Sequence, residues 1–358
     1  MATVVKTPAD DLEGYTLHSG WHITTKIQKR IGASGANFGI CYLATKGERH
    51  AFVKAVDFRL AFTQKDFVAA VAALANHALW EREVMEYCRL HGMSQIVQLI
   101  DHEEVLLPSA LGDATQRIFC LVMEVGNGDL RGELSVQNAK SGSWKLYVAR
   151  DVALALDQLH RRGVAHLDVK PSNVIAMREP TGNRTSMKLG DLGRVVRREV
   201  AGPFDNALWP GDTGYQPPEK WYGYQPKQWN DNREAADAFM LGSLLVFLFT
   251  GVSLTTLLMQ YVPDSFKPGV YRGAFAVPLV DVLIQAQAQV LESYVRPALP
   301  ISIKDELLTV IRNLTHPIPE SRGDVRARKQ GIVGIDRFHQ RLLRMAIHLE
   351  RLERLGRA

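Results

Sequence analysis

The sequence predicts an α+β protein built from two lobes. Short runs rich in β-branched and aromatic residues fill the first third of the chain, around a single helical segment. Helical periodicity dominates after the glycine-rich stretch Gly126-Asn127-Gly128. A length of 358 residues and a mass of 40.0 kDa suit two lobes that share one interface.

The expected elements follow in a definite order. In the first lobe we expect five strands, at 21–27, 40–44, 51–56, 96–100 and 118–125. One helix, at 65–91, is expected between the third and fourth strands. After these the pattern predicts helices at 143–162, 233–249, 281–297, 304–314 and 337–357. The expected domains are an N-terminal extension at 1–20, a β-rich lobe at 21–125, a larger helical lobe at 126–330 and a C-terminal helix at 331–358.

The C-terminal helix carries an apolar stripe at heptad-like spacing, formed by Phe338, Leu342, Met345, Leu349 and Leu352. Arginines occupy its other faces. Such a stripe packs either against the helix's own domain or against a second copy of the chain. Both alternatives, packing and self-association, stay open on the sequence.

Composition excludes several classes of protein. Hydrophobic residues make up 46% of the chain and charged residues 23%, which is typical of a globular protein. The net charge of +5 is mild and no Lys/Arg-rich block dominates, so no nucleic-acid partner is expected. Cys41, Cys88 and Cys120 show no metal-like spacing. We interpret them as core thiols of a reducing compartment, which predicts a cytoplasmic protein.

One segment resembles a membrane span by length, because residues 238–262 contain no charge. Small and polar residues dilute its apolar character, and Thr250-Gly251 is typical of a helix end. We therefore expect a buried core helix followed by a second short helix, and no membrane partner. Residues 1–20 carry three acidic residues and no apolar run, so no signal peptide is expected there.

Two polar strings carry the chemistry. The first is His166-Leu167-Asp168-Val169-Lys170-Pro171-Ser172-Asn173, and the second is Lys188-Leu189-Gly190-Asp191-Leu192-Gly193. Mg²⁺ prefers hard oxygen ligands and is often bound together with phosphates, and Asp191 and Asn173 can supply such oxygens. Asp168 is then free to accept a proton from an attacking hydroxyl, while Lys170 offsets charge on a moving phosphoryl group.

These strings resemble the signature of the protein kinase family of the Ser/Thr type, His-x-Asp-x-Lys-x-x-Asn followed by Asp-x-Gly. The resemblance extends over about residues 22–325. It implies a bilobal protein kinase fold, ATP and Mg²⁺ as cofactors, and transfer of the γ-phosphoryl group to Ser or Thr hydroxyls of a protein substrate. It assigns catalytic roles to Asp168, Lys170 and Asn173, and metal ligation to Asn173 and Asp191.

The resemblance extends to the nucleotide site. Lys54 matches the third-strand lysine that binds the α- and β-phosphates. An unpaired ammonium within an apolar run is costly, so Lys54 requires a carboxylate partner. We expect Glu83 in that role, with Glu81 and Glu86 as competing candidates. The resemblance assigns further nucleotide contacts to Gly35, Gly39, Cys41, Glu124, Gly126 and Ile175.

The stretch from Gly211 to Glu219 resembles the end of the family's activation segment, with Pro217-Pro218-Glu219 in place of Ala-Pro-Glu. Thr213 is expected beside Asp168 and Lys170. Arg322 is expected to form a buried ion pair with Glu219. Asp237 matches the start of the family's central buried helix.

The chain departs from the family pattern in three places. The phosphate loop has Ser34 and Ala36 where two glycines are usual, unless Gly32 and Gly35 serve instead. Phe52 stands where a small residue usually roofs the adenine, with Cys41 at a position usually held by valine. Leu167 replaces the arginine that, in other members, receives a phosphate from the activation segment.

The segment from Gly193 to Asp212 contains no Ser, Thr or Tyr. Together with Leu167, this predicts activity that does not depend on phosphorylation in that stretch, and leaves Thr213 and Tyr215 as the residues to test. Two alternatives to an active protein kinase remain. The chain is either a kinase-shaped pseudoenzyme that binds partners, or a phosphotransferase that acts on a small molecule.

Overall fold

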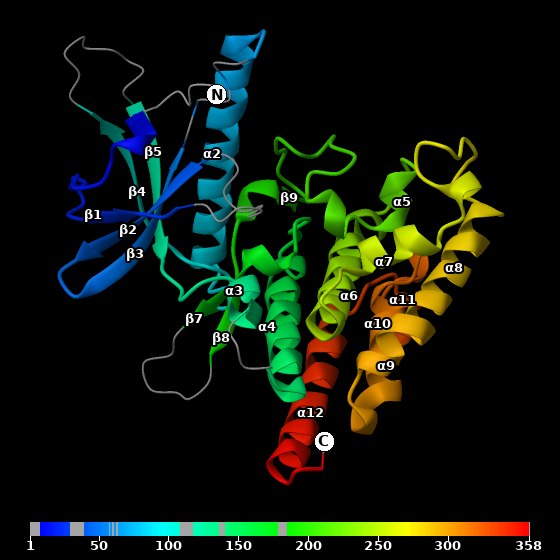
Figure 1. The fold of residues 1–358 in the computed structure, drawn as a ribbon. Coiled ribbons are helices and arrows are strands. Elements are labelled where there is room, and N and C mark those ends of the chain that lie inside the picture. The colour runs from blue at the N-terminus through cyan, green and yellow to red at the C-terminus, as the bar shows by residue number, and fades with distance from the viewer. Residues whose placement is uncertain are drawn as a thin grey trace, which may run out of the picture.

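The computed structural model describes residues 8–28, 39–56, 58, 61, 64–107, 117–135, 140–177 and 185–357. It confirms the α+β bilobal architecture. A five-stranded antiparallel sheet with one long helix, α2, forms the small N-lobe, and a mostly helical C-lobe follows (Figure 1). The expected phosphate-loop residues Gly32, Ser34, Gly35 and Ala36 lie outside the described residues.

The N-lobe sheet has the strand order β1-β2-β3-β5-β4. Its strands are β1 (His22–Lys26), β2 (Gly39–Lys46), β3 (Arg49–Val56), β4 (Leu99–Leu106) and β5 (Arg117–Glu124). Side chains alternate along β3, so Ala51, Val53 and Ala55 are buried on one face. Phe52 and Lys54 therefore point to the opposite face, toward α2 and the C-lobe.

The predicted fourth strand was placed too early. β4 begins at Leu99 and continues through Asp101, His102, Glu103 and Glu104, four polar residues in succession. β4 lies at the edge of the sheet, where exposed side chains alternate with buried or partly buried ones. Edge position, which hydrophobicity does not reveal, explains the error.

Residues 8–21 cover the outer face of the sheet. Leu12, Leu17 and Trp21 are buried in the same apolar cluster as Val53. The Tyr42 hydroxyl donates a 2.6 Å hydrogen bond to the carbonyl of Ala9. The described part of the expected extension therefore belongs to the N-lobe core.

Helix α2 (Phe67–Leu90) begins at Asp66, whose carboxylate accepts a hydrogen bond from the backbone N–H of Ala69. Its buried residues at helical spacing include Leu74, Ala78, Met85 and Cys88. This face points at the sheet and at the cleft between the lobes.

The C-lobe is built around α4 (Gly142–His160) and α6 (Ala235–Thr250). Short strands carry its loops: β6 (Val164–Ala165), β7 (Val174–Met177), β8 (Ser186–Leu189) and β9 (Val196–Arg197). The remaining helices are α3 (Leu130–Ser135), α5 (Pro218–Trp221), α7 (Leu254–Tyr261), α8 (Leu279–Val290), α9 (Arg296–Ala298), α10 (Lys304–Leu314), α11 (Val325–Arg328) and α12 (Ile335–Arg354).

Helix α6 is the charge-free segment of the sequence, and most of its side chains are buried in the C-lobe core. Within the described ranges no helix by itself has the length and apolarity to cross a bilayer. The stretch Asn230–Thr250 and helix α7 meet that test only as a pair, bent by 89°.

Helix α12 packs along α4 (Figure 1). Phe338, Leu342, Met345 and Leu349 are buried, and Glu353 accepts hydrogen bonds from the backbone and hydroxyl of Ser143. The apolar stripe of this helix therefore packs mainly on its own domain, which is one of the two alternatives that the sequence left open. Self-association through the C-terminal helix is untested and stays a prediction.

Arg322 and Glu219 form the expected buried ion pair. The guanidinium donates to both carboxylate oxygens at 3.0 and 2.7 Å, and both side chains are fully buried. Backbone carbonyls of His316 and Ala235 accept the remaining donors. The pair ties α5 to the loop before α11.

We predict that Arg322→Ala lowers the free energy of unfolding by about 3–5 kcal/mol, because it leaves the Glu219 carboxylate buried and unpaired. Denaturant titration measures this change. The control is Arg296→Ala, which removes an exposed arginine paired with Glu292 and Asp305 and should change stability little. Equal effects of the two substitutions would contradict a structural role of the buried pair.

Candidate active site

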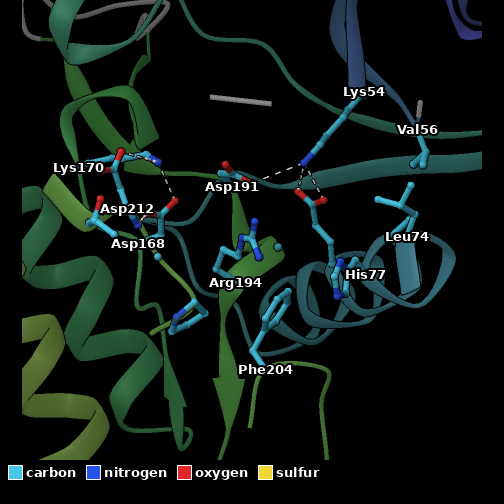
Figure 2. Close-up of a pocket in the computed structure, with 16 residues that line it drawn as sticks. Lys54, Val56, Leu74, His77, Asp168, Lys170, Asp191, Arg194, Phe204 and Asp212 are labelled. Carbon is cyan, nitrogen blue, oxygen red and sulfur yellow. Dashed lines mark hydrogen bonds and ion pairs between the residues drawn. The ribbon is translucent and has the colours of Figure 1, made fainter. Parts of the chain in front are cut away.

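A cleft of about 310 Å³ opens where β3, α2 and the loops after β6 and β8 meet (Figure 2). Side chains from distant parts of the sequence line it, among them Lys54, Glu81, Asp168, Lys170, Asp191 and Asp212. The fold therefore brings together four residues predicted from the two polar strings and from β3. Glu81 and Asp212 were not assigned to it.

The partner of Lys54 is Glu81, and the predicted partner Glu83 is wrong. Lys54 Nζ lies 2.7 and 2.8 Å from the two carboxylate oxygens of Glu81 and 3.5 Å from Asp191 Oδ1. Glu83 is exposed. Burial alone would lower the pKa of Lys54, but the carboxylates of Glu81 and Asp191 outweigh burial and raise this pKa above its usual value.

Helical spacing explains why Glu81 is the partner. Residues 74, 78, 85 and 88 are buried, and position 81 continues their three- and four-residue steps on the same face of α2. Glu83 lies two residues further on, about 200° around the helix axis. The apolar stripe was visible in the sequence and could have selected Glu81.

The loop from His166 to Asn173 is held by Asp237 at the start of α6. The Asp237 carboxylate is fully buried and accepts 2.8 Å hydrogen bonds from the backbone N–H groups of His166 and Leu167. His160 bonds the same carboxylate at 2.8 Å. Leu167 has φ +59°, a strained value for a branched side chain, and this anchoring holds it there.

Asp168, Lys170 and Asn173 meet at the end of this loop. Asn173 Nδ2 donates to the backbone carbonyl of Asp168 at 2.8 Å and to its Oδ2 at 3.0 Å. Lys170 Nζ lies 3.0 Å from the same Oδ2. Burial raises the pKa of Asp168, and the nearby ammonium of Lys170 only partly offsets that effect. A carboxylate with raised proton affinity is suited to accept a proton.

Asp212, rather than Thr213, lies beside Asp168 and Lys170 (Figure 2). The backbone N–H of Asp212 donates to Asp168 Oδ1 at 2.8 Å, and its Oδ2 lies 3.4 Å from Lys170 Nζ. Thr213 is exposed, and its hydroxyl makes no hydrogen bond within the described part of the chain. The prediction followed residue type and was displaced by one position.

Asp191 and Asn173 have the chemistry of a magnesium site. Asn173 commits its amide N–H group to Asp168, which leaves the amide oxygen as a possible ligand. The backbone N–H of Gly190 donates to the Asn173 carbonyl at 2.8 Å, so Asp191 follows directly beside it. Among the described residues, no three or more His, Cys, Asp or Glu side chains form a group that could hold a metal ion by themselves. Mg²⁺ usually takes one or two protein oxygens and completes its shell with phosphates and water, which this donor set fits.

The segment after β5 carries two of the expected nucleotide contacts, Glu124 and Gly126, and packs against β7. A Cβ atom at Gly126 would overlap Ile175 Cγ2 and lie 2.7 Å from the Ala176 carbonyl, so this position requires glycine. The backbone of Asn127 donates to Ala176, and Ala176 donates to Gly128. The Glu124 carboxylate pairs with Lys188 at 2.7 Å, so this side chain is committed to the protein.

Gly39 and Cys41 lie on β2, opposite Val56 and Lys54. A Cβ atom at Gly39 would lie 2.8 Å from the Ala55 carbonyl, which explains the glycine. Cys41 is buried, and Phe52 is partly buried against the cluster that contains Met123. Of the expected nucleotide contacts, Gly35 lies outside the described residues.

The segment after Gly193 is fastened to α2 by aromatic contacts. The rings of His77 and Phe204 lie 4.7 Å apart, and the Arg194 guanidinium lies 5.0 Å from the centre of the Phe204 ring (Figure 2). Trp80 Nε1 donates a 3.0 Å hydrogen bond to the Val195 carbonyl. Sequence reasoning missed these residues, because no local pattern pairs residues more than a hundred positions apart.

Comparisons with known proteins agree with this geometry. The family model described as "Protein kinase domain" matches residues 26–325. Similar proteins include "Serine/threonine-protein kinase/endoribonuclease IRE1a" of Arabidopsis thaliana, 32% identical over 30% of this chain and 12% of that protein. "Serine/threonine-protein kinase Pkn1" of Myxococcus xanthus is 30% identical over 51% of this chain and 25% of the relative.

"Probable serine/threonine-protein kinase PknB" of Bifidobacterium longum is 28% identical over 66% of this chain. The chain spans 12%, 25% and 34% of the lengths of these three relatives. The matched region extends over parts of both lobes and contains every described residue of the cleft. The chain belongs to the protein kinase family.

Proposed function

We propose that this protein is an ATP- and Mg²⁺-dependent protein kinase that transfers the γ-phosphoryl group to Ser or Thr hydroxyls of a protein substrate. One observation carries the proposal. Lys54 is paired with Glu81 and lies 3.5 Å from Asp191, in the cleft that also holds Asp168 and Lys170, and Asn173 is hydrogen-bonded to Asp168. The names of the relatives support the Ser/Thr class.

Each residue has a physical role in this mechanism. Lys54, oriented by Glu81, binds the α- and β-phosphates. Asp168 accepts a hydrogen bond from the substrate hydroxyl and takes its proton as the new oxygen–phosphorus bond forms. The bond from the γ-phosphorus to the β–γ bridging oxygen breaks, and ADP leaves. Lys170 offsets negative charge on the transferred group, and Asn173 holds the carboxylate of Asp168 in position.

Asp191 and Asn173 would hold Mg²⁺, which neutralises phosphate charge when bound. Buried thiols support a cytoplasmic location: no disulfide joins Cys41, Cys88 and Cys120, and burial raises the pKa of Cys88 and of Cys120 to about 12.

Activity in this proposal does not require phosphorylation of the 193–212 stretch. A phosphate on that segment commonly orders it by pairing with cationic residues. Here Phe204 takes the contact with His77 and Arg194 that a phosphate would otherwise supply, and Trp80 binds Val195. These contacts support a segment that is ordered without a phosphate.

The direct test incubates the purified chain with labelled ATP, Mg²⁺ and a generic protein substrate. We expect label on Ser or Thr, lost on chelation of Mg²⁺ and in Asp168→Ala and Lys54→Ala. Nucleotide binding without transfer would instead support the pseudoenzyme. Label on small molecules but never on protein would support the small-molecule phosphotransferase.

We predict that Glu81→Gln lowers kcat/KM about 100-fold, because Lys54 loses the carboxylate that orients it. Glu83→Gln, the matched change on the exposed face of α2, should stay within about twofold of the wild type. Steady-state kinetics with varied ATP measures both. A larger loss in Glu83→Gln would contradict the assigned pair.

We also predict that phosphatase-treated protein keeps its activity, whereas Phe204→Ala loses about tenfold in kcat because the segment loses its contact with α2. Phe249→Ala is the control, since Phe249 also has a cation, Lys145, over its ring but lies away from the cleft. Activity abolished by phosphatase and restored by a phosphate on Thr213 or Tyr215 would overturn the idea.

A further inference from the structure

Asp212 adds a fourth carboxylate to a cleft in which Glu81, Asp168 and Asp191 already lie (Figure 2). It faces the ammonium group of Lys170, while Lys54 in the same cleft is paired with Glu81 and Asp191. Its side chain is partly exposed, at 23%. A negative charge kept where a triphosphate is expected to bind requires a reason.

Both backbone polar groups of Asp212, its N–H and its carbonyl, are hydrogen-bonded. Its N–H donates to Asp168 Oδ1, while its carbonyl accepts hydrogen bonds from Trp209 Nε1 at 3.2 Å and from the N–H of Tyr215 at 3.1 Å. A Cβ atom at the preceding Gly211 would overlap the carbonyl oxygen of Leu167. The segment thus lies directly on the loop that carries Asp168.

The carboxylate of Asp212 has two partners. Oδ1 accepts a 2.8 Å hydrogen bond from the N–H of Gly214, and Oδ2 lies 3.4 Å from Lys170 Nζ. Lys170 is 4% exposed, with Asp168 Oδ2 at 3.0 Å. The buried ammonium is therefore held between two carboxylates from different segments.

We propose that Asp212 is a positioning residue whose negative charge holds the Lys170 ammonium in line with Asp168. This inference rests on the proposed kinase activity. Its backbone N–H orients one oxygen of Asp168, and its carboxylate prevents Lys170 from turning away from the other. Asp212 contacts neither nucleotide nor acceptor in this account and acts through Lys170 and Asp168.

A purely structural role would give a different result. If the carboxylate only caps the turn at Gly214, an amide oxygen can replace it, and Asp212→Asn should behave like the wild type. If its charge holds Lys170, then Asp212→Asn should behave like Asp212→Ala. The backbone N–H bond to Asp168 survives in both variants.

The first experiment measures kcat and both KM values for Asp212→Asn and Asp212→Ala. We expect kcat to fall about tenfold in each, with KM for ATP and for protein substrate within about twofold of the wild type. Asp324→Asn is the control. Asp324 also caps backbone N–H groups, those of Arg326 and Ala327, and faces a cation, Arg337, at 3.6 Å, but lies outside the cleft. Wild-type kcat in Asp212→Asn, or a change confined to KM, would overturn the proposal.

The second experiment does not depend on activity. An amine-selective acylating reagent is added to the folded protein, and the labelling rates of Lys170 and Lys54 are measured by peptide mass spectrometry. In Asp212→Asn we expect Lys170 to react several-fold faster relative to Lys54, whose carboxylate partners are unchanged. An unchanged ratio would refute the holding role. If the wild type transfers no phosphate, the proposed function fails, and this ratio still decides the role of Asp212.

Discussion

A positive charge on the inner face of a largely apolar sheet sets the requirement that organises this protein. Lys54 follows the alternation of β3 and points away from the N-lobe core, so its ammonium must be neutralised across the gap to α2. Glu81 supplies one carboxylate and Asp191 another. Three segments far apart in sequence, drawn from both lobes, thus meet at a single nitrogen atom.

Buried charges in the C-lobe are paired in the same way. Asp237 is fully buried and is satisfied by two backbone N–H groups and by His160. It holds the loop in a conformation that Leu167 would not adopt freely. Arg322 and Glu219 fix the other end of the 193–219 segment. Buried carboxylates therefore act as anchors for backbone that carries the chemistry, and each is fully paired, as burial demands.

Much of this could be predicted from the sequence. The two polar strings and Lys54 were located by residue type and spacing, because those groups have few chemical substitutes. Two site assignments were wrong: the partner of Lys54 lies two positions before the predicted residue, and the neighbour of Lys170 lies one position before. The sequence prediction named Glu83, although the buried stripe of α2 favours Glu81. It named Thr213 by residue type, whereas Asp212 makes the contacts with Asp168 and Lys170. The contacts of Phe204 and Trp80 with α2 arise from tertiary packing, which no local pattern encodes.

The ring of Phe204 has a consequence for control. A phosphate can be added and removed within minutes by other enzymes, but a phenylalanine cannot be erased. In the proposed mechanism, the tilted rings of Phe204 and His77, 4.7 Å apart, hold the segment in place for as long as α2 stays where it is. Under that proposal, control would act through the amount of the enzyme or through a protein that separates α2 from this segment.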